Sequence, residues 1–444
     1  MKTTAKNNTK LIYDTNEIPP IGKLLLLSFQ HVFAMFGATI LVPILVNGLI
    51  REMIKTKTGA DIPGDVMSIG IALFSSGIGT LIYILCTKAK SPVYLGSSFA
   101  FITPLALVYV TDGISGMATG IITTGLVYIL FAILIKIFGK EWINKLLPPV
   151  VVGPMIVIIG LVLAPNAISQ MGLVEGAFNP KFFLVAMISF LVTCIVSIKA
   201  KGFVKVIPFL IGIISGYIVA AIIGIIDFDN IKNASFIEVP KFYLPFKDYH
   251  FSPSGFITML PIAIVSIAEH IGDHMALSTI IGKDLIKDPG LERTLLGDGL
   301  ATSFAGLIAG PANTTYSQNT SIVGMSKVAS VWVMATAAII SIIFSFFGII
   351  TAIFSSIPDA VLGGASLLLY GFISVNGLKV LIENKVNFDN LKNVIIVSAM
   401  LVLGLGGAIV TLSFKDITFS LTGMSLAAII GIFLNLIIPN PSEY

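Results

Sequence analysis

Four ionisable side chains lie close together inside the apolar stretch 256–281, and they are the residues best suited to chemistry in this chain. Glu269 and Asp273 are spaced i,i+4, so on a helix they would share one face. His270 and His274 would share the neighbouring face by the same spacing. Carboxylates accept hydrogen bonds from a ligand, and both side-chain types can bind and release protons.

The apolar surroundings decide how this cluster is interpreted. An acidic side chain at the centre of a membrane helix costs about 2.5–3.5 kcal/mol, so such residues normally face a bundle interior or a wet cavity. They then mark a path for an ion or a substrate. The alternative is that the four groups lie at the water interface or serve as satisfied structural hydrogen-bonding groups. The first interpretation is favoured.

The composition excludes a soluble enzyme. Of the 444 residues, 56% are hydrophobic and 11% are charged, against about 25% charged in ordinary soluble domains. A membrane enzyme is disfavoured, because the cluster at 269–274 departs from the HExxH zinc pattern and carries no nucleophile–base spacing. Cys86 and Cys194 are isolated within apolar runs, which predicts neither a disulfide nor a metal site. No cofactor and no nucleic-acid partner are expected.

Apolar stretches of membrane-spanning length recur along the whole chain and predict an all-α polytopic membrane protein in the lipid bilayer. We expect fourteen segments, at 24–47, 66–87, 94–110, 115–138, 147–165, 181–199, 205–226, 256–281, 293–310, 312–326, 328–353, 358–380, 391–408 and 419–438. With the N-terminus in the cytoplasm, nineteen of the 27 Lys and Arg side chains fall on the cytoplasmic side. This positive-inside asymmetry supports fourteen segments with both termini cytoplasmic.

Two of the segments do not begin like membrane helices. The stretch 92–101 (PVYLGSSFAF) and the stretch 311–319 (PANTTYSQN) each open with proline and continue with β-favouring or hydroxyl residues. They are the third segment of the first seven and the third of the second seven, so the chain reads as two inverted seven-segment repeats. Interrupted segments at matching positions of two halves point to a transporter binding site at the midplane. The alternative is a pair of kinked helices whose hydroxyls bond to their own turn.

The last three segments of each half are predicted to form a framework against which the polar core moves. Segments five to seven and twelve to fourteen carry almost no ionisable residues and contain small residues that allow close helix packing. We expect a cytoplasmic tail at 1–23, a core domain from 24–138 and 256–353, and a gate domain from 147–226 and 358–438.

Six stretches together resemble the nucleobase–ascorbate transporter family, also called nucleobase:cation symporter-2, and specifically its bacterial uracil permeases. They are SFQHVFAMFGAT (28–39), YLGSSFAFI (94–102), AEHIG (268–272), DPGL (288–291), NTTY (313–316) and LLYG (368–371). They span nearly the whole chain in the order expected of the family.

The resemblance implies that a nucleobase binds between the two interrupted segments. Phe99 would offer its backbone and ring to the base, and Glu269 would bond its NH and carbonyl edge. Tyr316, Ser317 and Gln318 would form the opposite wall. The resemblance also implies that His31 supports the site, a location in the bacterial cytoplasmic membrane and a homodimer through the gate domain.

Three positions depart from the uracil permeases of that family. This chain has Gln318 where they carry a second glutamate, Ser317 where they carry glycine, and Asp273 where they carry histidine. Gln318 and Asp273 are instead similar to the xanthine and purine branch. A neutral amide cannot carry a proton, so Glu269 is the main candidate for proton coupling, with Asp273 one turn away as its partner and His31 in support.

The sequence therefore predicts a proton-coupled symporter that imports uracil by alternating access. Xanthine or another oxopurine is the alternative substrate, and sodium is the alternative coupling ion. The alternative from another class is an anion channel or exchanger on a related inverted-repeat fold. The Glu269 and Asp273 pair opposes that alternative, because two carboxylates would repel a small anion.

Overall fold

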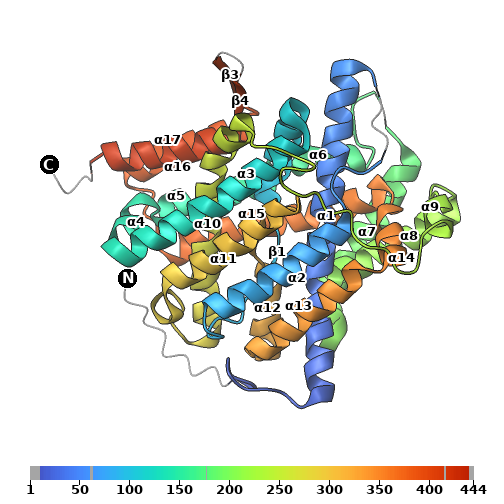
Figure 1. Cartoon of the computed structure of the whole chain (residues 1–444), viewed down its shortest axis with the longest axis horizontal. Coiled ribbons are helices and arrows are strands. Elements are labelled where there is room, and N and C mark those ends of the chain that lie inside the picture. Colours follow the sequence, from blue (N-terminus) through green and yellow to red (C-terminus); the bar gives the residue numbers. More distant parts are fainter. Residues whose placement is uncertain (1–10, 61–63, 177, 415–416, 440–444) are drawn as a thin grey trace.

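The computed structural model describes residues 11–60, 64–176, 178–414 and 417–439, and these are mostly helical (Figure 1). The first ten residues of the predicted cytoplasmic tail lie outside this range. The first half contains α1 (Ile21–Thr58), α2 (Ile69–Cys86), β1 (Leu95–Ser97), η1 (Phe99–Phe101), α3 (Ile102–Phe138), α4 (Glu141–Leu146), α5 (Pro149–Leu161), α6 (Ala164–Gln170), α7 (Pro180–Lys199), η2 (Gly202–Val206), α8 (Pro208–Ile223) and α9 (Asp229–Lys232).

The second half runs in a similar order. It contains α10 (Pro253–Ile281), η3 (Ile286–Gly290), α11 (Leu291–Leu307), β2 (Asn313–Thr315), α12 (Ser317–Ser326), α13 (Val331–Ser345), α14 (Gly348–Ser355), α15 (Asp359–Glu383), α16 (Leu391–Leu405), β3 (Ile409–Phe414), β4 (Ile417–Thr422) and α17 (Gly423–Ile437).

Several of these helices are suited to cross a bilayer. Among the described residues, seven helical spans are long and apolar enough by length and composition, and α13 with α14, bent by 83°, would make an eighth. Helices α8, α16 and α17 are apolar but shorter. All fourteen predicted segments overlap a helix, and the exact count of crossings stays a prediction. The chain is a multi-pass membrane protein.

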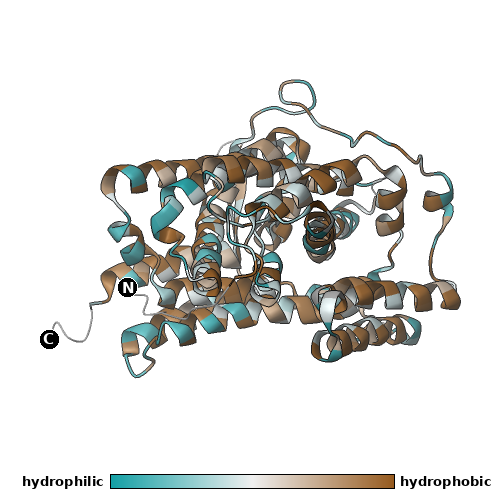
Figure 2. Cartoon of the chain, turned by 90° about the horizontal axis from the view of Figure 1, so that it is seen from below, coloured by the Kyte–Doolittle hydropathy of each residue, from teal (hydrophilic) through white to brown (hydrophobic). Residues whose placement is uncertain are grey.

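Apolar side chains also cover the outside of the molecule. Figure 2 shows hydrophobic residues along most of the helices. Large exposed apolar side chains follow α7, α8, α16 and α17, for example Ile198, Ile222, Val402 and Leu436. Exposure of this kind is unfavourable in water and ordinary in lipid. The outer surface therefore matches a lipid environment.

The helix that carries the ionisable cluster has clear sequence signals at both ends. The Ser252 hydroxyl caps the start of α10 by accepting a 3.0 Å hydrogen bond from the Gly255 N–H, and Pro253 occupies the first turn. At the other end Gly282 adopts a left-handed conformation, with φ of 70°. These caps fix the two ends of the helix that carries Glu269.

Segments three and four are joined in one helical element with a break. Within α3, Asp112 and Gly113 have non-helical backbone angles, and Gly113 has φ of 57°. Glycine adopts this region without a Cβ clash. The predicted boundary between 110 and 115 therefore coincides with the break.

A hairpin between α16 and α17 was not predicted. Strands β3 and β4 pair antiparallel, from Ile409 opposite Thr422 to Phe414 opposite Ile417. The predicted all-α fold, with short extended stretches in segments three and ten, did not include this hairpin, and helix α17 begins at 423 rather than 419. Hydropathy does not separate an apolar strand from an apolar helix, whereas the β-branched residues of 409–418 favour strands.

The helices pack in two groups. Helices α1, α2, α3, α10, α11 and α13 contact mainly one another, and α5, α7, α8, α15, α16 and α17 form the second group. These groups resemble the predicted core and gate sets, while the domain division itself stays a prediction. The residues of the site lie where the two groups meet.

Candidate functional site

The two interrupted segments form one small antiparallel sheet. Strand β1 pairs with β2 in the register Leu95–Thr315, Gly96–Thr314 and Ser97–Asn313. The Ser98 N–H donates to the Ala312 carbonyl at 2.9 Å, which extends the pairing by one bond. All residues of both strands are buried. Extended backbone inside a membrane must be satisfied by protein, and here each broken segment satisfies the other.

A short helix leaves each end of this sheet. Element η1 begins at Phe99 and continues into α3, and α12 begins at Ser317. Because the strands are antiparallel, the two helices leave from opposite ends, each with its N-terminus at the sheet. The first N–H groups of a helix have no partner within it and carry the positive end of its dipole. The sheet is therefore flanked by two sets of hydrogen-bond donors.

The two carboxylates of α10 face the second broken segment. Glu269 Oε2 accepts a hydrogen bond from the Thr314 hydroxyl at 3.4 Å. Asp273 accepts from the Thr315 hydroxyl at 2.6 Å and from the Ser317 hydroxyl at 2.9 Å. Both carboxylates are half-buried. Asp273 is bonded more closely than Glu269, which leaves the Glu269 carboxylate more available to a ligand.

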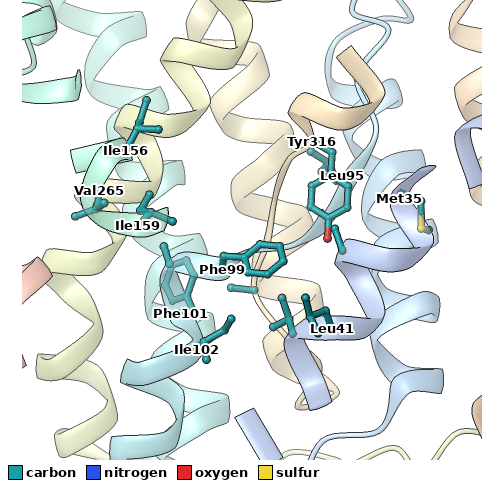
Figure 3. Close-up of a cluster of buried hydrophobic side chains, with 14 of the residues drawn as sticks. Met35, Leu41, Leu95, Phe99, Phe101, Ile102, Ile156, Ile159, Val265 and Tyr316 are labelled. Carbon is teal, nitrogen blue, oxygen red and sulfur yellow. The ribbon is translucent and has the colours of Figure 1, made fainter. Parts of the chain in front are cut away.

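Tyr316, which the resemblance places in the wall opposite Glu269, is held by hydrogen bonds to both β1 and α1. Its hydroxyl donates to the Ser97 carbonyl at 2.9 Å and accepts from the Thr39 hydroxyl at 3.1 Å. The side chain is 3% exposed, and a Cβ on Gly96 would clash with its ring. Tyr316 therefore ties β2 to β1 and to α1. Figure 3 shows its ring beside Leu95.

Phe99 lies at the contact between the two packing groups. Its ring packs edge-on against Tyr370 of α15 with centroids 6.2 Å apart, and its side chain is buried. Figure 3 shows Phe99 beside Phe101 and Leu41 in a cluster of buried apolar side chains.

His31 supports the start of α12 from the first helix. Its Nδ1 lies 3.1 Å from Asn319 Nδ2, and its backbone carbonyl accepts from the same amide at 3.3 Å. An amide nitrogen only donates, so Nδ1 accepts and Nε2 carries the hydrogen of the neutral ring. His31 thus holds α12 against α1 in this arrangement.

A cavity opens next to these residues, between α12, α8 and α15. Its volume is about 290 Å³, and its lining includes Ser317, Gln318, Ser321, Asn376 and Lys379. A smaller pocket of about 20 Å³ adjoins it and shares Gln318, Phe209 and Leu369. Gln318 therefore lies where the larger cavity and the smaller pocket meet.

The structure brings Glu269, Asp273 and Ser317 together and places Gln318 at the cavity, whereas Phe99 and Tyr316 are packed away from it. Sequence reasoning assigned no role to Thr314, Thr315 or Asn319, although all three lie in or beside the NTTY motif. Their hydroxyl and amide groups inside an apolar chain were the signal that could have identified them.

Two broken helices paired through a sheet, with intramembrane carboxylates beside them, define a polytopic membrane transporter. The chain belongs to the Permease family, whose model matches residues 22–413. The resemblance drawn from its motifs is confirmed, and members of this family are transporters rather than enzymes.

Relatives of this chain include three proteins described as uracil permeases. The one from Bacillus subtilis (strain 168) is 44% identical over 443 residues, covering 98% of this chain and 97% of the relative. The one from Bacillus caldolyticus is 43% identical and covers 97% and 95%. The one from Escherichia coli (strain K12) is 38% identical and covers 97% and 94%.

Solved structures with a similar fold include anion transporters. The transmembrane domain of a cyanobacterium bicarbonate transporter BicA has a TM-score of 0.58 at 16% identity, covering 95% of this chain and 99% of that one. The murine Slc26a9 anion transporter in the inward-facing state has a TM-score of 0.67 at 11% identity, covering 95% and 68%. At these identities the likeness concerns the fold alone.

Proposed function

We propose that this chain is a proton-coupled permease that imports uracil across the bacterial cytoplasmic membrane by alternating access. The full-length similarity to uracil permeases supports the substrate class. The observation that carries the proposal is the position of the Glu269 carboxylate beside the β1–β2 sheet, where the 3.4 Å contact with Thr314 leaves it available. A carboxylate that can release and rebind a proton there joins base binding to proton transfer.

The chemistry of the site suits a planar base with N–H and carbonyl groups on one edge. A Glu269 oxygen would accept from a ring N–H, and the first N–H groups of η1 and α12 would donate to carbonyl oxygens. The Phe99 ring would supply a stacking surface once it separates from Tyr370. These roles combine the predicted contacts with the placement of the two half-helices.

The cavity suggests how the base leaves. It extends from Gln318 to Lys379 near the end of α15, and the predicted topology puts Lys379 on the cytoplasmic side. We infer a state open to the cytoplasm, with the opposite route closed by contacts such as Phe99 with Tyr370. Movement of the core group against the gate group would then open the other side. Both termini are proposed to be cytoplasmic, and the gate group is proposed to form a homodimer.

Specific observations favour two alternatives to this proposal. Gln318 lines the cavity where uracil permeases of the resembled family carry glutamate, which favours xanthine or another oxopurine as a second candidate substrate. The anion transporters of similar fold make small-anion exchange a candidate of another class. The carboxylates of Glu269 and Asp273 oppose it through like-charge repulsion.

Uptake of radiolabelled uracil tests the proposal. We expect uptake to collapse when a protonophore is added and when Glu269 is changed by Glu269→Gln, whereas Glu175→Gln, in an exposed loop, keeps wild-type uptake. Uptake that is indifferent to both treatments would overturn the proposal. Uptake that requires sodium at fixed pH would assign sodium as the coupling ion. Chloride or sulfate currents in liposomes would support the anion transporter.

A further inference from the structure

A second group of buried ionisable side chains lies behind the carboxylates of the site. Asp298 of α11 and His270 of α10 form a fully buried pair, with His270 Nδ1 2.7 Å from Asp298 Oδ2. The imidazoles of His270 and His274 stack with ring centroids 4.1 Å apart. Neither His270 Nε2 nor Asp298 Oδ1 has a hydrogen-bond partner among the described residues. The three side chains form one compact cluster, which we call the histidine–aspartate cluster.

The cluster is connected to the end of α2 by two short hydrogen bonds. His274 Nε2 lies 2.6 Å from the Tyr83 hydroxyl, which lies 2.9 Å from the Ser91 hydroxyl. Tyr83 and Ser91 are both buried. Ser91 follows Lys90, whose ammonium is half-exposed and paired with Asp288. The predicted topology places this end of α2 at the cytoplasm, so the chain of bonds runs from that side to His274.

The donors and acceptors along this series of hydrogen bonds determine where the hydrogens lie. His274 Nδ1 lies 2.8 Å from the His270 carbonyl, which only accepts, so Nδ1 carries a hydrogen in both charge states. In the structure Tyr83 donates to Ser91, which is the polarity of the imidazolium; in the neutral ring Nε2 must accept from Tyr83, so the bond reverses and Ser91 donates to Tyr83. In the imidazolium Nε2 donates to Tyr83, and Tyr83 donates to Ser91. The same heavy-atom distances satisfy both polarities.

One proton can therefore pass from Ser91 through Tyr83 to His274 while both hydrogen bonds are kept. A proton that reaches the Ser91 oxygen displaces the hydroxyl hydrogen of Ser91 to Tyr83, and the hydrogen of Tyr83 passes to His274 Nε2. Each oxygen ends with the number of hydrogens it had, and the imidazole gains one positive charge. The Asp298 carboxylate supplies the balancing negative charge, so the cluster is neutral overall with one extra proton. Pairing the imidazolium with this carboxylate avoids an uncompensated buried charge, which is strongly destabilising.

The surroundings contain few other charges. The titratable groups that act on the cluster are Tyr83 of α2, Tyr128 of α3, and Glu269 and Asp273 of α10. Cys86 lies within electrostatic range of Tyr83, and Arg293 of α11 acts on Cys86. Glu269 adjoins His270 in sequence and interacts electrostatically with Asp298. A change of charge in the cluster is thus felt by the carboxylate of the proposed substrate site.

We propose that the histidine–aspartate cluster is a second proton-binding site, filled from the cytoplasmic end of α2 through Ser91 and Tyr83, which acts on Glu269 by charge. The inference rests on the proposed proton-coupled function. Protonation of the cluster removes its net negative charge, which favours the ionised form of Glu269 and so promotes release of the Glu269 proton after the base has left. Net uptake needs this release in every cycle. Exchange of internal for external base does not, because Glu269 can stay protonated throughout.

The test compares these two modes in proteoliposomes with Tyr83→Phe, which keeps the ring and removes the hydroxyl. We expect proton-driven net uptake of uracil to fall about 100-fold, the size of a lost proton-transfer group. Exchange and equilibrium binding are expected to stay near wild-type values, which also shows that the variant is folded. The matched control is Tyr249→Phe, a buried tyrosine whose hydroxyl donates to the Leu307 carbonyl at 2.9 Å, away from the cluster and its chain of bonds. We expect it to keep both modes.

The outcomes distinguish failure of this inference from failure of the proposed function. If Tyr83→Phe leaves net uptake intact, or lowers uptake and exchange together, the inference is wrong while the proposed function stands. If Tyr249→Phe shows the same split as Tyr83→Phe, the effect is not specific to the chain of bonds and the inference is also wrong. If wild-type uptake ignores a protonophore, the proposed function fails first and the inference fails with it.

Discussion

The Thr315 hydroxyl donates a 2.6 Å hydrogen bond to the Asp273 carboxylate, and this bond joins the second broken segment to α10. Ser317, the first residue of α12, donates to the other oxygen of the same carboxylate at 2.9 Å. A carboxylate at a helix N-terminus also interacts favourably with the helix dipole. Asp273 is therefore placed to position α12, whereas Glu269 is the more available of the two for binding and proton transfer.

This difference predicts separate phenotypes for the two acids. In Asp273→Asn one oxygen acceptor remains, and the weakened bonds to Thr315 and Ser317 should loosen α12. A hydrogen bond to a charged group contributes about 1.5–3 kcal/mol, so we expect KM for uptake to rise about 10-fold or more with transport still measurable. Asp389→Asn, in an exposed turn, is the control. An unchanged KM in Asp273→Asn would contradict the positioning role.

Gln318 is expected to set substrate preference. It lines both the open cavity and the innermost pocket, and a neutral amide both donates and accepts on a base edge. Gln318→Glu removes the donors and should shift relative affinity from xanthine towards uracil. Binding of both bases to wild type and variant measures this, with Ser321→Ala at the cavity margin as the control. No change in either affinity would remove Gln318 from the selectivity of the site.

The close approach of Tyr316 to β1 predicts a stability effect at Gly96. A Cβ at this position would overlap the Tyr316 ring and approach the Thr39 hydroxyl. Overpacking of a buried site costs about 1–3 kcal/mol, so Gly96→Ala should lower the melting temperature of the purified protein by several degrees. Gly48→Ala in α1 has open space around the new Cβ and should be neutral or slightly stabilising. Equal effects of the two changes would contradict the packing described here.

The N-terminal segment is held by an ion pair that should respond to pH. Lys283 Nζ lies 2.5 Å from Asp14 Oδ1, with both side chains partly exposed. Partial burial tends to raise the pKa of Asp14, but the hydrogen bond and charge of Lys283, together with hydrogen bonds from Thr15, outweigh it and hold that pKa below its usual 3.8. The stabilisation is therefore present above the unfolded-state pKa and is lost as pH falls through the folded-state value.

Lys283→Met should accordingly lower the melting temperature slightly at neutral pH, since exposed pairs contribute about 0.2–1 kcal/mol. The difference from wild type should shrink below about pH 4 and at high salt. Thermal unfolding of the purified protein across pH measures this, with Lys136→Met at an exposed position of α3 as the control. A difference that grows on acidification would contradict the assignment.

The sequence by itself determined the class of the protein and the elements of its site. Length, apolar composition and charge asymmetry predicted a multi-pass membrane protein, because a bilayer admits few solutions for a chain of this kind. The proline-led stretches at 92–101 and 311–319 predicted extended backbone where β1 and β2 are found. The i,i+4 spacing of Glu269 and Asp273 predicted that both would face the same neighbour.

Only the tertiary structure decided which partner each group has. The pairing of Ser97 with Asn313, the bonding of Asp273 by Thr315, and the burial of Tyr316 depend on contacts between residues far apart in the chain. The β3–β4 hairpin could not be separated from helix by hydropathy, because apolar strands and helices look alike in that measure. The pair formed by His270 and Asp298 arises in the same way, since spacing along one helix says nothing about the helix that packs beside it.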